Sequence, residues 1–141
     1  MTFEDLDAWK KARKLVNTIY AITRHGALAK DFGLCGQIQR AVVSAMSNVA
    51  EGFERRHFAE KLQAYNVARG SCGEVRSLLY VIEDNYSLNS AAALECRKLI
   101  VEVGSLISGL IASTRKRLAA KATVAVSLAS VITWIGLHLV A

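Results

Sequence analysis

Four successive segments of this chain carry apolar residues at spacings of three and four, and no proline interrupts any of them. That spacing places the apolar side chains on one face of an α-helix, whereas a proline inside a helix would break it. The segments cover about residues 2–25, 31–56, 58–84 and 90–120, and the connections between them are short. We therefore predict an all-α fold in which residues 1–120 form an antiparallel, up-down-up-down four-helix bundle.

The predicted helix ends carry residue types that suit them. Gly26 stands where the first helix should end, the second helix should begin near Asp31, and Gly52 should close it. Beside Gly52, Asn48 and Glu51 either hold this turn or a subunit contact, or they contact a partner or ligand. The predicted core positions of the fourth helix are Leu94, Leu99, Ile100, Val103, Leu106, Ile107, Leu110 and Ile111.

The net charge of +6 is concentrated in one short stretch. Residues 1–110 contain all 12 acidic residues and 14 of the 18 lysines and arginines, so this part carries only +2. The remaining basic residues are Arg115, Lys116, Arg117 and Lys121. The charge surplus is therefore a local basic cluster, and most of the bundle surface should be close to neutral.

Residues 121–141 differ in composition from the rest of the chain. From residue 122 onward no side chain carries a formal charge. At about 1.5 Å per residue, a helix of this length would span about 30 Å, the thickness of a bilayer core. We predict an extra apolar C-terminal helix here. It is a candidate membrane segment, an extension of the fourth helix buried between subunits, or a sequence foreign to the natural protein.

Nothing in the sequence has the spacing of a catalytic or metal site. His25, His57 and His138 are scattered, and no pair of them has the spacing of metal ligands. The three cysteines include no C-x-x-C pair, and the charged N-terminus does not resemble a secretion signal. We expect a non-enzymatic, cytoplasmic protein without metal or cofactor, whose thiols are reduced and buried. The cysteines are Cys35, Cys72 and Cys96.

An ordered series of motifs gives the chain a family resemblance. The motifs are residues 3–13 (FEDLDAWKKAR), 32–34 (FGL), 37–44 (QIQRAVVS), 47–53 (SNVAEGF) and 68–71 (ARGS). Together they resemble the four-helix-bundle proteins encoded by intervening sequences in bacterial 23S ribosomal RNA genes. Residues 101–104 (VEVG) weakly resemble a related branch, the accessory protein of diversity-generating retroelements.

The resemblance carries several expectations about function. It implies a homopentamer with nucleic acid as its ligand and without catalytic residues. For the retroelement branch it also implies a reverse transcriptase as partner. Three departures stand out: Met46 occupies a position where the family often has proline, His25 and Gly26 stand where it often has Phe-Pro, and the apolar tail lies outside the family pattern.

Two functions from different classes therefore remain open. The first is a homo-oligomeric, pentameric scaffold that serves as a nucleic-acid-binding or ribonucleoprotein accessory protein. A pentamer would repeat each basic patch five times, so several phosphate contacts could act together; otherwise these residues form an ordinary solvated helix face. The candidate nucleic-acid-binding residues are Lys10, Lys11, Arg13, Lys14, Arg40, Arg55 and Arg56.

The second function is a membrane-tethered or pore-forming oligomer that uses the C-terminal apolar helix. Positive charge beside a membrane segment is typical of its cytoplasmic flank. The predicted flank is Arg115, Lys116, Arg117 and Lys121. A weakly polar stripe in the tail would face other helices or line a pore, and the protein would then be associated with the inner membrane. The stripe is Thr123, Ser127, Ser130, Trp134 and His138.

Overall fold

The computed structural model is built from helices. It describes the backbone of residues 2–86 and 90–139, and the side chains of residues 2–86 and 91–124. In order, the elements are the short 3₁₀ helix η1 (Phe3–Asp5), α1 (Asp7–Ile22), the 3₁₀ helix η2 (Leu28–Lys30), α2 (Phe32–Glu54), α3 (Phe58–Asn85) and α4 (Ser90–Leu139). The prediction of an all-α fold with four main helices is confirmed.

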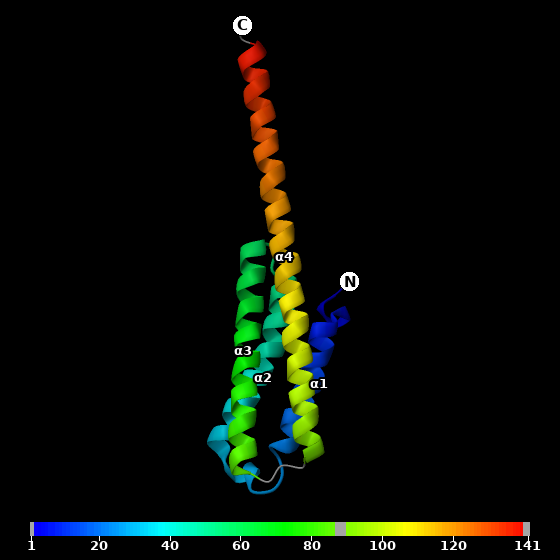
Figure 1. Ribbon diagram of the computed structural model, residues 1–141, viewed down its shortest axis with the longest axis vertical. Coiled ribbons are helices and arrows are strands. Elements are labelled where there is room, and N and C mark those ends of the chain that lie inside the picture. The colour runs from blue at the N-terminus through cyan, green and yellow to red at the C-terminus, as the bar shows by residue number, and fades with distance from the viewer. Residues whose placement is uncertain (1, 87–89, 140–141) are drawn as a thin grey trace.

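The four α-helices pack as a bundle in which each has two neighbours. α1 lies against α2 and α4, and α3 lies against the same two helices. Successive helices run in opposite directions, and α4 continues well past the others (Figure 1). The α1–α2 connection lies at one end of the bundle, and residues 55–57, which join α2 to α3, lie at the other. We call this second end the α2–α3 end.

The core is apolar and draws on all four helices. Burying one aliphatic side chain of this size stabilises a fold by about 1.5–3 kcal/mol, so the eleven that are fully buried, together with Cys96, dominate the stability of the bundle. The largest fully buried side chains are Leu15, Ile19, Ile38, Leu79, Ile82, Ile100, Ile107, Val42, Val49, Val75, Val103 and Cys96. These residues recur at the helical spacing seen in the sequence.

Leu94 is a predicted core residue that the structure places on the surface, with 67% of it exposed. Leu94 lies nine residues, or two and a half turns, before the buried Val103. It must therefore point in the opposite direction. Ala93 and Cys96 occupy the inward positions at that level of α4.

Local hydrogen bonds hold the end of the bundle opposite the α2–α3 end. α2 begins beside Asp31, which caps it, since the Leu34 N–H donates to Asp31 Oδ1 at 2.9 Å. The Tyr86 hydroxyl, at the end of α3, donates to Asp31 Oδ2 at 2.7 Å. These two bonds, that from Leu34 first, lower the pKa of the Asp31 carboxyl. Gly26 adopts a left-handed φ of 67°, which explains a glycine between α1 and α2.

Gly52 does not close α2, contrary to the prediction. The helix continues to Glu54, and Gly52 is buried within it. A Cβ at this position would overlap the ring of Tyr65 on α3. Glycine is needed here because it lets α3 approach α2 closely.

α4 is one helix of 50 residues, about 75 Å long at about 1.5 Å per residue. The expected extra C-terminal helix is therefore not a separate element but a direct continuation of the fourth. The reason is local: no proline or glycine occurs between residues 110 and 135, so nothing ends the helix at residue 120. Beyond the α2–α3 end, α4 projects away from the bundle (Figure 1).

No helix within the described part of the chain is long and apolar enough to cross a membrane. The side chains of residues 125–141 lie outside the described residues. The predictions of a membrane segment and of a polar stripe along it rest mainly on those side chains.

Candidate nucleic-acid and subunit interfaces

The predicted basic residues of α1 are largely held by carboxylates of the bundle. Lys11 Nζ lies 2.8 Å from Glu102 on α4, and Lys14 Nζ lies 2.5 Å from Glu95. Lys10 Nζ donates to the backbone carbonyl of Asp5 at 3.0 Å. We call the two ion pairs to α4 the α1–α4 ion pairs. Because their charges are compensated, they make α1 a weaker phosphate-binding surface than the sequence suggested.

Arg13 and Arg40 lie on separate surfaces. The guanidinium of Arg13 packs over the Trp9 ring, 5.7 Å from its centroid. Arg40 lies on α2, along a shallow groove that includes Tyr20 of α1. The structure does not gather the seven predicted nucleic-acid-binding residues into one patch.

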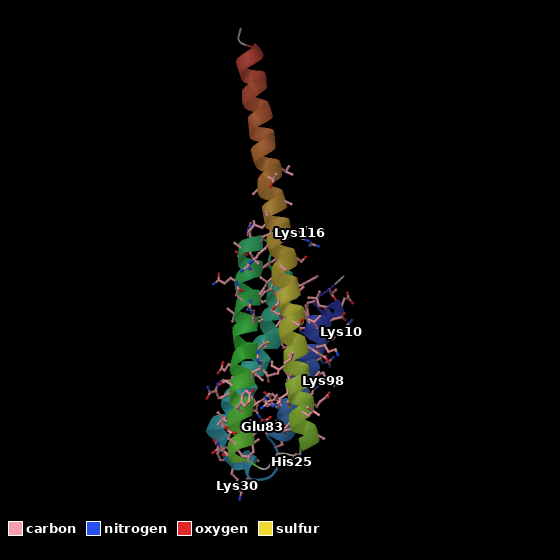
Figure 2. All side chains as sticks on the ribbon, viewed as in Figure 1. Lys10, His25, Lys30, Glu83, Lys98 and Lys116 are labelled. Atoms are coloured by element: carbon pink, nitrogen blue, oxygen red, sulfur yellow. The ribbon has the colours of Figure 1, made fainter. Side chains whose placement is uncertain are left out.

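Arg55 and Arg56 instead lie with the predicted membrane-flank residues. Both are in the α2–α3 connection, which lies beside the part of α4 that carries the basic cluster (Figure 1). In Figure 2, Lys116 is labelled at this end, Lys10 lies further down on α1, and Lys30 lies at the opposite end of the bundle. From the sequence these two groups were predicted to have different functions, but the fold places them at the same end of the bundle.

Lys61, which the sequence analysis missed, belongs to the same end. Its Nζ donates to the backbone carbonyls of Gly52 at 3.1 Å and Phe53 at 2.5 Å, which are otherwise unpaired carbonyls in the last turn of α2. Burial lowers the pKa of Lys61, and the positive charge of Arg117 on α4 lowers it further, against the opposing effect of Glu54. The signal in the sequence was weak because Lys61 is an isolated lysine within α3.

Most cations at this end have no carboxylate partner. Arg55 pairs with Glu51 at 2.6 Å. Among the described residues, none of the others in the connection or in the basic cluster of α4 forms an ion pair. These unpaired cations are Arg56, Arg115, Lys116, Arg117 and Lys121. Glu54 and Glu60 also act on Lys61 and Arg55 here, so this end presents a surplus of positive charge that they compensate only in part.

A second unusual surface is the outward face of α4. Residues 103–114 contain no charged side chain, although about half of them face outward from the single chain. Further along the same face, Leu94 and Val101 are 67% and 60% exposed. A Cβ built on Gly104 or Gly109 meets no described atom within 4 Å. A surface helix normally presents charged and polar side chains to water, so this face is atypical.

The remaining candidates from the sequence have local structural roles. The Asn48 amide donates to the carbonyl of Ser44 at 2.9 Å within α2, and Glu51 holds Arg55. Cys35, Cys72 and Cys96 are buried, free thiols. Burial raises the pKa of Cys72 and of Cys96 to about 11, so both remain protonated at neutral pH.

The number and order of the helices place the chain among small, antiparallel four-helix-bundle proteins. It belongs to the family of 23S rRNA-intervening sequence proteins, whose sequence model matches residues 4–109. The match ends before Arg115, so the basic cluster of α4 lies outside it. The resemblance seen in the sequence is thus confirmed at the level of the family, and the link to diversity-generating retroelements remains a prediction.

Comparison with solved structures supports the same fold. The chain is similar to a crystal structure from Bacteroides thetaiotaomicron VPI-5482, described as a protein of unknown function from the S23 ribosomal protein family. The TM-score is 0.67 at 17% sequence identity, and the match covers 74% of this chain and 94% of the other. At this identity the likeness shows the fold alone. No curated protein matches the sequence.

Proposed function

We propose that this protein is a non-enzymatic, homo-oligomeric helical scaffold that binds nucleic acid as a ribonucleoprotein accessory protein. The observation that carries the proposal is the outward face of α4, which is uncharged over residues 103–114 and carries one charge, Lys98, on the stripe before them. Its stripe is spaced by four and three residues in alternation, the spacing of helices that pack along one another. The stripe consists of Leu94, Lys98, Val101, Ser105, Ser108 and Ala112.

The glycines on α4 support close packing against another helix. Glycine in a helix interior costs about 1 kcal/mol relative to alanine. Within one chain, no described atom packs where the Cβ of Gly104 or Gly109 would be. Small residues at an interface let two helices approach closely, which would offset this cost.

A second copy of the chain is the simplest partner for this face. Every chain has the same face, so a closed ring would cover all of them without another component. The resemblance to the family supports a ring of five. Such a ring would also repeat the cations of the α2–α3 end in each subunit, which favours binding to a polyanion such as nucleic acid.

Light scattering after size exclusion tests the oligomer directly. We expect a mass of about 77 kDa, five times the 15.3 kDa of one chain. The variant Val101→Glu should lower this mass, because it places a charge on the proposed interface. Val67→Glu is the matched control, since Val67 is 47% exposed on α3 and away from this face. A wild-type mass of 15.3 kDa at about 100 μM would refute the scaffold, and a dimer would refute the pentamer.

The predictions of a membrane function and of a reverse transcriptase partner have no support from the described residues. The membrane-tethered or pore-forming alternative depends on side chains outside the described residues. A reverse transcriptase partner depends on the resemblance alone. Fractionation of host cells tests the first, because a membrane-tethered protein would remain with the membranes through a carbonate wash.

A further inference from the structure

The α2–α3 end and the projecting part of α4 meet at a basic corner. The connection between α2 and α3 forms its floor, and α4 rises beside that floor as a wall (Figure 1). The floor carries Arg55 and Arg56, which are exposed, with Lys61 beneath them. The wall carries Arg117 and Lys121. We call these five residues the basic corner.

The helical phase of α4 directs Arg117 and Lys121 toward the α2–α3 connection. Leu110 and Thr114 belong to the inward face of α4, and Thr114 is only 8% exposed. Arg117 and Lys121 continue that face at spacings of three and four residues, so they point to the same side of the helix. The inward face therefore changes from apolar to basic where α4 leaves the bundle. The effect of Arg117 on the pKa of Lys61 agrees with this placement.

The basic corner gathers several cations that form no ion pair. Elsewhere Lys11, Lys14 and Arg97 each face a carboxylate on a neighbouring helix. In the basic corner, Arg56, Arg117 and Lys121 have no carboxylate partner among the described residues. Like charges held together repel, and a bound polyanion would relieve that repulsion.

We propose that the basic corner binds the phosphate backbone of a double-helical nucleic acid, laid across the floor and against the wall. This proposal rests on the proposed function and adds the site and the form of the ligand. A duplex carries one phosphate charge per about 1.7 Å of its axis and presents charge on all sides, so it can contact floor and wall together. A flat membrane surface could contact only one of them.

The aromatic residues at this end favour a duplex over a single strand. Binding of single strands usually relies on exposed aromatic rings that stack on bases. Here Tyr65 is 4% exposed, and the Phe53 ring is partly buried with Lys61 5.7 Å from its centroid. Among the described residues of the α2–α3 connection, the exposed ring is the imidazole of His57, and no phenylalanine, tyrosine or tryptophan there is fully exposed. Contacts to the backbone are therefore expected, with little dependence on base sequence.

Fluorescence anisotropy with the full chain and a labelled 20-base-pair DNA duplex tests the proposal, with an RNA duplex of the same sequence as competitor. The test variant is Arg117→Gln with Lys121→Gln. The matched control is Arg115→Gln with Lys116→Gln, which removes the same charge from the same helix but from positions outside the basic corner. We expect at least tenfold weaker binding for the test pair and less than threefold for the control. The slope of log K against the logarithm of the salt concentration should become less steep by about 1.8 for the test pair, because two phosphate contacts are lost.

Further measurements separate the alternatives. Circular dichroism checks that each variant folds, and Arg55→Gln with Arg56→Gln should weaken binding from the floor side. Equal losses for the test and control pairs would show a general charge effect and overturn the basic corner. Duplex binding that no corner variant weakens would overturn the basic corner but leave the proposed function standing. A wild-type chain that binds no duplex at about 50 mM salt would refute nucleic-acid binding, while its oligomer mass is measured separately.

A further experiment tests whether the basic corner binds lipid headgroups. Vesicles containing phosphatidylserine are titrated with the same variants. If the test pair abolishes vesicle binding and leaves duplex binding unchanged, the basic corner is a lipid headgroup site and the proposal is wrong. If vesicle binding is unaffected by the test pair while duplex binding falls, the proposal is supported.

Discussion

Replacing Gly104 and Gly109 with alanine should have opposite effects on the single chain and on the assembly. Both glycines lie in the interior of α4, and a Cβ at either would meet no described atom within 4 Å. Each replacement should therefore stabilise the isolated chain by about 1 kcal/mol. For a chain of this size, the resulting gain of about 2 kcal/mol raises the melting temperature by about 5–10 °C.

The assembled protein should respond in the other direction. If another helix packs directly against these glycines, each added methyl group overpacks the contact, which typically costs about 1–3 kcal/mol. A loss of that size weakens a subunit contact by at least about fivefold. We expect dilution to dissociate the variant at concentrations where the wild-type protein remains assembled, as measured by sedimentation velocity.

The matched control is the pair Gly70→Ala and Gly73→Ala on α3. A Cβ at either of these glycines also meets no described atom within 4 Å, so the gain from helix propensity is the same. Unlike residues 103–114 of α4, this part of α3 is flanked by charged residues, as a water-exposed surface would be. If both alanine pairs raise the melting temperature equally and leave the mass unchanged, the α4 face is open to solvent and the scaffold proposal fails.

Three further outcomes follow from the core and its ion pairs. Gly52→Ala should lower the melting temperature, by about 1–3 kcal/mol of stability, because the new methyl group displaces Tyr65; an unchanged melt would contradict the close contact. Cys72 should react with Ellman's reagent at pH 8 only after denaturation, because burial raises its pKa to about 11. The hydrogen bond from Arg97 lowers the pKa of Glu83 in the folded protein. The ionised Glu83 therefore stabilises the fold fully above about pH 4.5, and this stabilisation is lost as the pH falls through the lowered pKa of the folded state. Thermal melts of Glu83→Gln should accordingly show less stability at pH 7 and a smaller decline on acidification.

The helices could be predicted because their signals are local. The spacing of apolar residues and end signals such as Gly26 depend on neighbours within one or two turns. Leu94 was predicted to be a core residue because it is apolar. Its position two and a half turns before the buried Val103 instead places it on the opposite face of α4. Gly52 was misread because its reason is Tyr65 on another helix, a contact that no local pattern reveals.

The candidate site depended on topology. Arg56 and Arg117 are about sixty residues apart, and only the antiparallel course of α3 and α4 brings them to the same end. The sequence located the basic cluster correctly but could not say what faces it. The predicted domain boundary at residue 120 left open whether the tail extends the fourth helix, and uninterrupted helix-forming residues do carry α4 through it. The grouping of the basic corner is therefore information from the fold.

The uninterrupted course of α4 has a consequence for symmetry. In any cyclic arrangement of identical chains, every α4 would emerge from the same side, so the two faces of the ring would differ. In a ring of five, one face would carry five projecting helices with a basic corner at the base of each, and the other would carry the α1–α2 connections that include η2. Such a ring would be polar, and it would bind a long polyanion with one face only. A second ring could not stack on the face that carries the projecting helices unless the helices of the two rings interleaved.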